Sequence, residues 1–192
     1  MVITYQGGNY FKIQSGDYVI LIDPENQRSF KGAQVVVNTV KPTFADPMEG
    51  DGAPVWIENQ GEYEIGGVRI HGYSTGWNEK AKCENTAYQI LCDDISLVIL
   101  GHLYTELDPK VISTLADSDI VIVPAGGTPF IDVIKAAKLV RQLEPGIIIP
   151  TLTEKPNQFF KELNREGKKE EKLTIKKKEI EAKAMRVVWL GA

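Results

Sequence analysis

Few side chains in this sequence could perform metal or acid–base chemistry. The only histidines are His71 and His102, and the only cysteines are Cys83 and Cys92. A catalytic zinc site takes about three protein ligands from His, Asp, Glu and Cys, and neither histidine has another histidine two or four positions away. Magnesium or calcium could be held by oxygen ligands alone. The histidine content therefore argues against an ordinary zinc site.

Two single residues remain as candidates for acid–base catalysis. His102 follows the apolar run Ser96–Gly101 and could be a lone general base or a pH-sensitive contact. The alternative is that it fills space and hydrogen-bonds to the backbone. Asp23 follows the buried run Tyr18–Ile22, where its carboxylate could reach the same place, but Asp before Pro24 is also a common turn and capping residue. For both residues the structural role is favoured over the catalytic one.

A glycine pair marks a third candidate site. Gly126, Gly127 and Thr128 follow the apolar run Asp119–Ala125 and precede a helical pattern with Pro129 near its first turn. In such a geometry backbone N–H groups could hold an anion. The segment lacks the Lys of a P-loop and the spacing of a dinucleotide fingerprint. A tight strand-to-helix turn is the favoured interpretation, and an anion site is the alternative.

These candidates follow short apolar runs that predict a sheet. Runs of Val, Ile and Leu bounded by Gly and Pro predict strands, buried on both faces, at Ser96–Gly101, Asp119–Ala125 and Gly146–Pro150. Helical patterns at Asp108–Ala116 and Pro129–Leu143 lie between them. In α/β folds ligands gather at the carboxyl ends of such strands, so any chemistry is expected there.

The rest of the chain predicts mainly further strands. These are expected at Val2–Gln6, Asn9–Gln14, Tyr18–Pro24, Gln34–Thr39, Pro54–Glu58, Gly61–Ile65, Val68–Tyr73, Asn85–Cys92, Leu173–Lys177 and Arg186–Leu190. The polar segments Thr43–Gly52 and Ser74–Glu84 predict loops, and Asn157–Arg165 predicts a helix with Phe159, Phe160 and Leu163 on it.

Composition favours one globular domain over residues 1–192. Hydrophobic residues make up 43% of the 192 residues and charged residues 25%, and no Pro-, Ser- or Gly-rich linker divides the chain. The start lacks the pattern of a secretory signal, and no apolar run approaches the ~20 residues of a spanning helix. We therefore expect a cytoplasmic protein without a membrane partner. Two cysteines are too few for a disulfide framework.

The charge distribution argues against a nucleic-acid partner. The formal net charge is −4. The segment Lys161–Arg186 is basic, with 10 Lys or Arg against 6 Glu, and could contact nucleic acid or another anionic partner. Because the Glu residues are interleaved and aromatic stacking residues are few, a solvated charged edge is the favoured interpretation.

Seven phrases, taken in order, resemble the metallo-β-lactamase superfamily. They are VITYQGGNYFKIQSG near the start, ILIDP, GEYEIGGVRIHG, ENTAYQI, VILG followed by TEL, VPAGGT, and AAKLVRQLEPGIIIP. The resemblance covers nearly the whole chain. It indicates the small bacterial branch of zinc-dependent-hydrolase-like proteins that is similar to ascorbate-6-phosphate lactonase. It implies an α/β fold of the metallo-β-lactamase type, a four-layer αββα sandwich.

The resemblance also implies a metal site whose ligands are changed in this chain. Relatives bind one or two divalent metals through an H-x-H-x-D-H motif, a later His, a bridging Asp and a final His. The matching positions are Val40, Pro42 (or Lys41 after a shift by one), Phe44, Ala45, Trp77, His102 and Leu152. In this fold the corresponding loops converge, so we expect Phe44, Trp77, His102 and Leu152 to form a buried apolar plug.

The expected function is that of a pseudoenzyme. Without metal or another cofactor, such a domain would act as a binding or scaffolding module for a small molecule or a protein partner. The alternative is a hydrolase of an ester-like bond, a lactone or phosphodiester, working with zinc or manganese or through His102 and Asp23 alone. The sequence leaves the ligand open, and also whether the chain forms a homo-oligomer.

Overall fold

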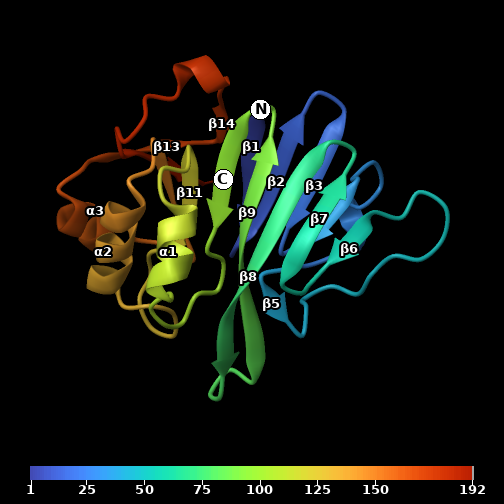
Figure 1. Ribbon diagram of the computed structural model, residues 1–192, viewed down its shortest axis with the longest axis horizontal. Coiled ribbons are helices and arrows are strands. Elements are labelled where there is room, and N and C mark those ends of the chain that lie inside the picture. Colours follow the sequence, from blue (N-terminus) through green and yellow to red (C-terminus); the bar gives the residue numbers. More distant parts are fainter. Residues whose placement is uncertain (192) are drawn as a thin grey trace.

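The strands form two sheets that pack face to face (Figure 1). The structure is a computed structural model and describes residues 1–191. The first sheet has six strands, in the order β14 (Lys172–Thr174), β1 (Val2–Gly7), β2 (Tyr10–Ser15), β3 (Tyr18–Ile22), β4 (Val35–Val37) and β6 (Val55–Ile57). The second has nine, in the order β13 (Gly167–Glu170), β15 (Arg186–Leu190), β12 (Ile147–Thr151), β11 (Ile120–Pro124), β10 (Ile95–Ile99), β9 (Cys83–Cys92), β8 (Val68–Asn78) and β7 (Gly61–Ile65), with β5 (Val40–Lys41) paired to β9.

The main core lies between the sheets and follows from strand alternation. Inward-facing residues of both sheets, among them Phe11, Ile22, Tyr88 and Ile122, are buried in one cluster. The central strands β10, β11 and β12 lie where strands were predicted, and they run parallel. They are apolar on both faces because their outward residues contact helices instead of water.

Three helices cover the outer face of the second sheet: α1 (Pro109–Leu115), α2 (Val133–Leu143) and α3 (Asn157–Leu163). The side chain of Asp108 caps α1, and that of Asp132 caps α2 by accepting from two backbone N–H groups. Helix α2 begins at Val133, later than the predicted start at Pro129, and buries Ala136, Ala137, Leu139 and Val140 but leaves Ile134 exposed. Among the described residues no helix is long and apolar enough to cross a membrane.

The outer face of the first sheet is covered mainly by irregular chain. Residues 24–54, which include the 3-10 turn η1 (Gln27–Ser29), place Phe30 and Ala33 against Val19, Leu21 and Val36. The predicted sandwich of the metallo-β-lactamase type is thus confirmed, with a layer of loop where a second layer of helices was expected.

One predicted loop is wrong. Instead of a loop at 74–84, β8 continues to Asn78 and β9 begins at Cys83, and the two strands project as an arm beyond the sandwich (Figure 1). Ladder pairing between the strands, with Trp77 opposite Glu84, overrides the polar composition. The sequence also did not predict β5 or β13, and β14 ends at Thr174 before a 3-10 turn, η2 (Lys177–Glu179).

Two glycines at strand ends permit close contacts between loops. A Cβ on Gly101, whose φ is +54°, would lie 2.1 Å from Thr39 Oγ1. A Cβ on Gly126 would lie 2.2 Å from the carbonyl oxygen of Leu152. A side chain at Gly101 would therefore overlap the Thr39 side chain, and one at Gly126 would overlap the backbone of Leu152.

We expect Gly101→Ala to destabilise the protein much more than Gly16→Ala. The two glycines have nearly the same φ, +54° and +56°, but a Cβ on Gly16 would meet nothing within 4 Å. The control should cost about 1 kcal/mol for backbone strain alone, and Gly101→Ala a further ~2 kcal/mol or more for overlap with Thr39. Urea unfolding measures both, and equal losses would contradict the packing argument.

Candidate functional site

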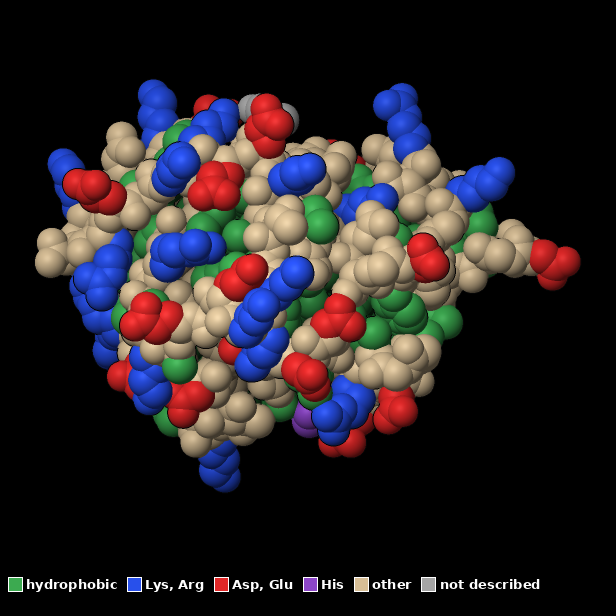
Figure 2. Space-filling view, turned by 90° about the horizontal axis from the view of Figure 1, so that it is seen from above, with side chains coloured by type: hydrophobic (Ala, Val, Ile, Leu, Met, Phe, Trp, Pro, Cys, Tyr) green, Lys and Arg blue, Asp and Glu red, His purple; other side chains and the backbone are tan. Residues whose placement is uncertain are grey.

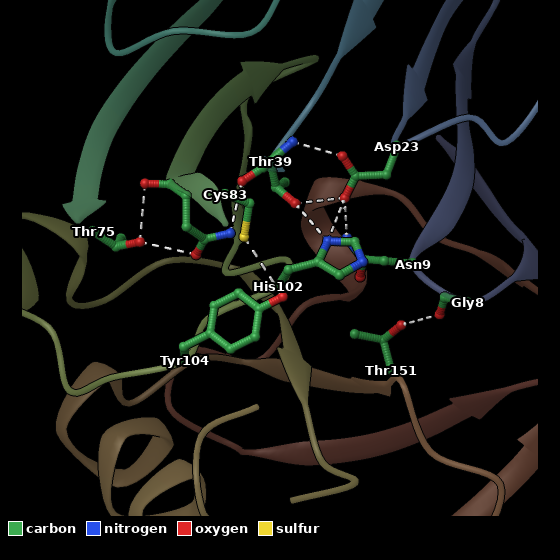
Figure 3. Close-up of polar contacts among 10 residues, drawn as sticks. Gly8, Asn9, Asp23, Thr39, Thr75, Cys83, His102, Tyr104 and Thr151 are labelled. Atoms are coloured by element: carbon green, nitrogen blue, oxygen red, sulfur yellow. Dashed lines mark hydrogen bonds and ion pairs between the residues drawn. The ribbon is translucent and has the colours of Figure 1, made fainter. Parts of the chain in front are cut away.

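The candidate site lies where loops from both sheets meet at one edge of the sandwich. Asp23 follows β3, Thr39 follows β4, His102 follows β10, and Asn9 lies in the turn between β1 and β2. Figure 3 shows their side chains pointing toward one another. All four residues are at most 6% exposed. The predicted candidates Asp23 and His102 are therefore brought together, with two partners that the sequence did not single out.

The carboxylate of Asp23 is held by several donors. Its Oδ1 accepts from the Thr39 backbone N–H at 2.6 Å. Its Oδ2 accepts from the Thr39 hydroxyl at 2.5 Å and from Asn9 Nδ2 at 2.6 Å, and lies 3.3 Å from His102 Nδ1. A carboxylate has about four acceptor positions, so this group has little capacity left for a substrate. These contacts join Asp23 to residues far along the chain, so they differ from the local turn or cap that was considered for it.

His102 uses one ring nitrogen for both of its polar neighbours. Nδ1 lies 3.1 Å from Thr39 Oγ1 and 3.3 Å from Asp23 Oδ2. Because the Thr39 hydroxyl gives its only proton to Asp23, Nδ1 must carry a proton to contact these two oxygens favourably. In a nucleophilic triad the hydroxyl and the carboxylate bind opposite ring nitrogens. The three residues therefore do not form such a triad, and the expected backbone hydrogen bond of His102 is replaced by side-chain contacts.

Aromatic rings surround the imidazole. The ring centroid of Phe44 lies 5.2 Å from that of His102, and the centroid of Phe130 lies 5.6 Å away. Tyr104 packs against Phe130 at 5.5 Å and accepts a hydrogen bond from the Cys83 thiol at 3.8 Å. Burial, with the Cys83 contact as a second cause, raises the pKa of Tyr104 to about 12. The phenol thus stays protonated at neutral pH and is not a base.

The residues at this edge do not fit the metal that the resemblance implies. Of the matched positions only His102 has a donor atom suited to a metal, and its Nδ1 already faces Thr39 and Asp23. Val40 and Ala45 are buried apolar residues, and Pro42 is an exposed one. Within residues 1–191 no group of three or more His, Cys, Asp and Glu side chains is arranged to hold a metal ion.

The predicted apolar plug is wrong in its membership and its burial. Phe44 contacts His102 but is 55% exposed, and Trp77 is 56% exposed on the arm. Leu152 is half-buried, and its N–H points to the Gly8 carbonyl at 3.4 Å. The arm places Trp77 on a face beside Glu84, outside the ring cluster, because β8 continues as a strand where a loop was expected.

The glycine turn is separated from the helix start that the considered anion site would use. Helix α2 begins at Val133, after Gly126, Gly127 and Thr128, and the N–H groups of its first turn are capped by Asp132 Oδ1. The Gly127 carbonyl accepts from the Phe130 N–H, closing a turn. This segment therefore connects β11 to the ring cluster, and the tight-turn interpretation accounts for its contacts.

Two other sequence features lie away from this edge. His71 stacks on Tyr73 with ring centroids 4.2 Å apart and has a side chain that is 40% exposed. In the basic segment, Lys177 pairs with Asp119 at 2.6 Å and Lys183 with Asp117 at 2.9 Å. Lys and Arg side chains crowd that side of the molecule with Asp and Glu among them (Figure 2).

The sequence reasoning missed four residues of this site: Asn9, Thr39, Tyr104 and Phe130. Thr39 could have been found from the sequence. It is the last residue of the predicted strand Gln34–Thr39, and His102 likewise lies at the end of a predicted strand. Tyr104 and Phe130 lie in loops outside the quoted phrases, and Asn9 lies inside the first phrase without a feature that marks it as a site residue.

A family model described as a beta-lactamase superfamily domain matches residues 2–152. No curated protein matches the chain. Among solved structures, a proposed zinc-dependent hydrolase of the metallo-β-lactamase superfamily from Thermotoga maritima is similar, with a TM-score of 0.77, 21% identity, and coverage of 98% of this chain and 97% of that one. A proposed metal-dependent hydrolase from Parabacteroides distasonis gives a TM-score of 0.69 at 17% identity, over 98% of this chain and 91% of that one.

An isothiocyanate hydrolase from Delia radicum gut bacteria has a TM-score of 0.65 at 13% identity, covering 92% of this chain and 99% of that one. At these identities the structural matches establish the fold. The family match spans most of the chain and includes the edge at which Asp23, Thr39 and His102 meet. This chain belongs to the beta-lactamase superfamily and has the metallo-β-lactamase fold of its hydrolase-like members.

Proposed function

We propose that this chain is a non-hydrolytic member of the superfamily that acts, as one domain, as a binding or scaffolding module. The observation that carries the proposal is the position of His102. It stands where relatives place a bridging Asp, yet its Nδ1 faces Thr39 and Asp23 and its ring lies between Phe44 and Phe130. A side chain held in this way stabilises the edge of the sandwich.

The chemistry of the neighbouring residues supports the same proposal. Hydrolysis by this fold needs ligands that bind a metal and polarise water, and the matched positions offer Val, Pro, Phe, Ala, Trp and Leu in their place. Asp23, the other catalytic candidate, has a side chain that is 1% exposed and already accepts hydrogen bonds on both oxygens. The competing function is a metal-dependent hydrolase of an ester-like bond, as the names of the structural neighbours suggest.

Purified protein should carry far less than one equivalent of zinc, manganese or iron, even after expression and dialysis with these metals. The physical reason is the lack of ligands beyond His102. Elemental analysis measures the content, with a metal-loaded hydrolase of the superfamily as the control. In parallel, lactone and phosphodiester substrates should be hydrolysed at the background rate, with or without manganese. A near-stoichiometric metal content, or a rate that His102→Ala abolishes, would establish the hydrolase instead.

Asp23→Asn should lower the free energy of unfolding by roughly 3 kcal/mol, because the amide NH₂ would face donors that now meet a carboxylate oxygen. Thr39→Val, which removes one of those donors and leaves the buried carboxylate less well satisfied, should cost about 2 kcal/mol. Urea unfolding measures both, and Asp17→Asn at an exposed turn serves as the control. A loss below about 1 kcal/mol for Asp23→Asn would show that the carboxylate is not structural.

A further inference from the structure

Two of the four large exposed apolar side chains in the described chain are aromatic and lie beside or close to one groove. Phe44 and Trp77 are 55% and 56% exposed, while Val55 begins β6 and Ile134 lies on α2. Trp77 lines a groove of about 520 Å³ together with Pro42 and Thr43, the residues directly before Phe44. Exposed aromatic residues beside a groove are typical of an interaction surface.

The groove is built on neighbouring strands. Lys41 of β5 pairs with Glu84 of β9, and Glu84 pairs with Trp77 of β8, so these three side chains stand in one row on one face of the arm. Asp46 and Glu58 complete the charged lining. Ladder pairing fixes this row, so the groove is a preformed feature of the arm.

The lining is acidic. Lys41 Nζ, the one cation of the groove, forms an ion pair with Glu58 Oε1 at 2.7 Å. This contact lowers the pKa of Glu58. Asp46 and Glu84 form no ion pair with any Lys, Arg or His of the described chain. The groove therefore presents an exposed indole beside three carboxylates, those of Asp46, Glu58 and Glu84, and only one cation, Lys41.

An exposed indole beside carboxylates favours binding of a cation. Ammonium and guanidinium groups are attracted to the face of an indole and to carboxylates. A nucleic acid could stack a base on Trp77, but its phosphates would be repelled by Asp46 and Glu84. We propose that the groove binds an Arg or Lys side chain of a basic segment in a protein partner. The inference gives the proposed binding module a ligand class.

A second copy of this chain fits the groove less well. A two-fold dimer through this face would bring two acidic grooves together. A contact between the groove of one copy and the basic segment Lys161–Arg186 of another would be head to tail, which builds a ring or an open filament instead of a two-fold dimer. A separate basic partner meets neither difficulty.

The test is calorimetric titration with a blocked peptide of Arg, Gly and Ser at low ionic strength, where charge attraction is least screened. The wild-type protein should bind it, and Trp77→Ala and Glu84→Gln should each weaken binding about tenfold. The matched controls are Ile134→Ala, which removes an equally exposed apolar side chain, and Glu62→Gln, which removes a carboxylate of similar exposure on β7. Both controls should bind like the wild type.

Several outcomes would overturn the inference: no binding of the Arg peptide, equal binding of a matching Glu peptide, unchanged binding by Trp77→Ala, or self-association in sedimentation that Trp77→Ala removes. Metal content is measured on the same samples. Metal-loaded protein would contradict the proposed function whatever the peptide does. Metal-free protein that does not bind the peptide would contradict only this inference and not the proposed function.

Discussion

The buried carboxylate of Asp23 is the contact on which the edge of this sandwich depends. Asp23 and Thr39 follow strands of the first sheet, and His102 follows a strand of the second, so one carboxylate joins loops of both sheets. A buried charge is costly unless it is paired and hydrogen-bonded. Its partners must therefore be present together, and Gly101 lets the backbone that carries His102 pass directly against Thr39.

The same constraint decides what this edge can do chemically. A carboxylate that accepts hydrogen bonds from Thr39 and Asn9 stabilises loops and has little capacity for a substrate. The rings of Phe44 and Phe130 pack against His102. Trp77, on the arm formed by β8 and β9, lines an exposed groove with an acidic lining.

Much of the fold could be predicted because its signals are local. Apolar runs bounded by Gly and Pro gave the parallel strands β10, β11 and β12, and a helical period gave α2. The lack of metal ligands could also be predicted from the sequence, because the side chains of Val40 and Phe44 have no donor atoms in any surroundings. The arm was missed because its residues are polar, and their strand conformation depends on pairing between β8 and β9.

The sequence by itself determined most of the element types, the sandwich family and the absence of metal donors at the matched positions other than His102. Only the tertiary structure decided which side chains meet. It placed Phe130 and Tyr104 near His102 and turned Trp77 away from it onto the exposed arm. The physical reason is that the spacing of apolar residues along the chain indicates only which face of its helix or strand a residue occupies. Contacts between loops depend on how elements far apart in the chain pack, and no spacing in the sequence records that.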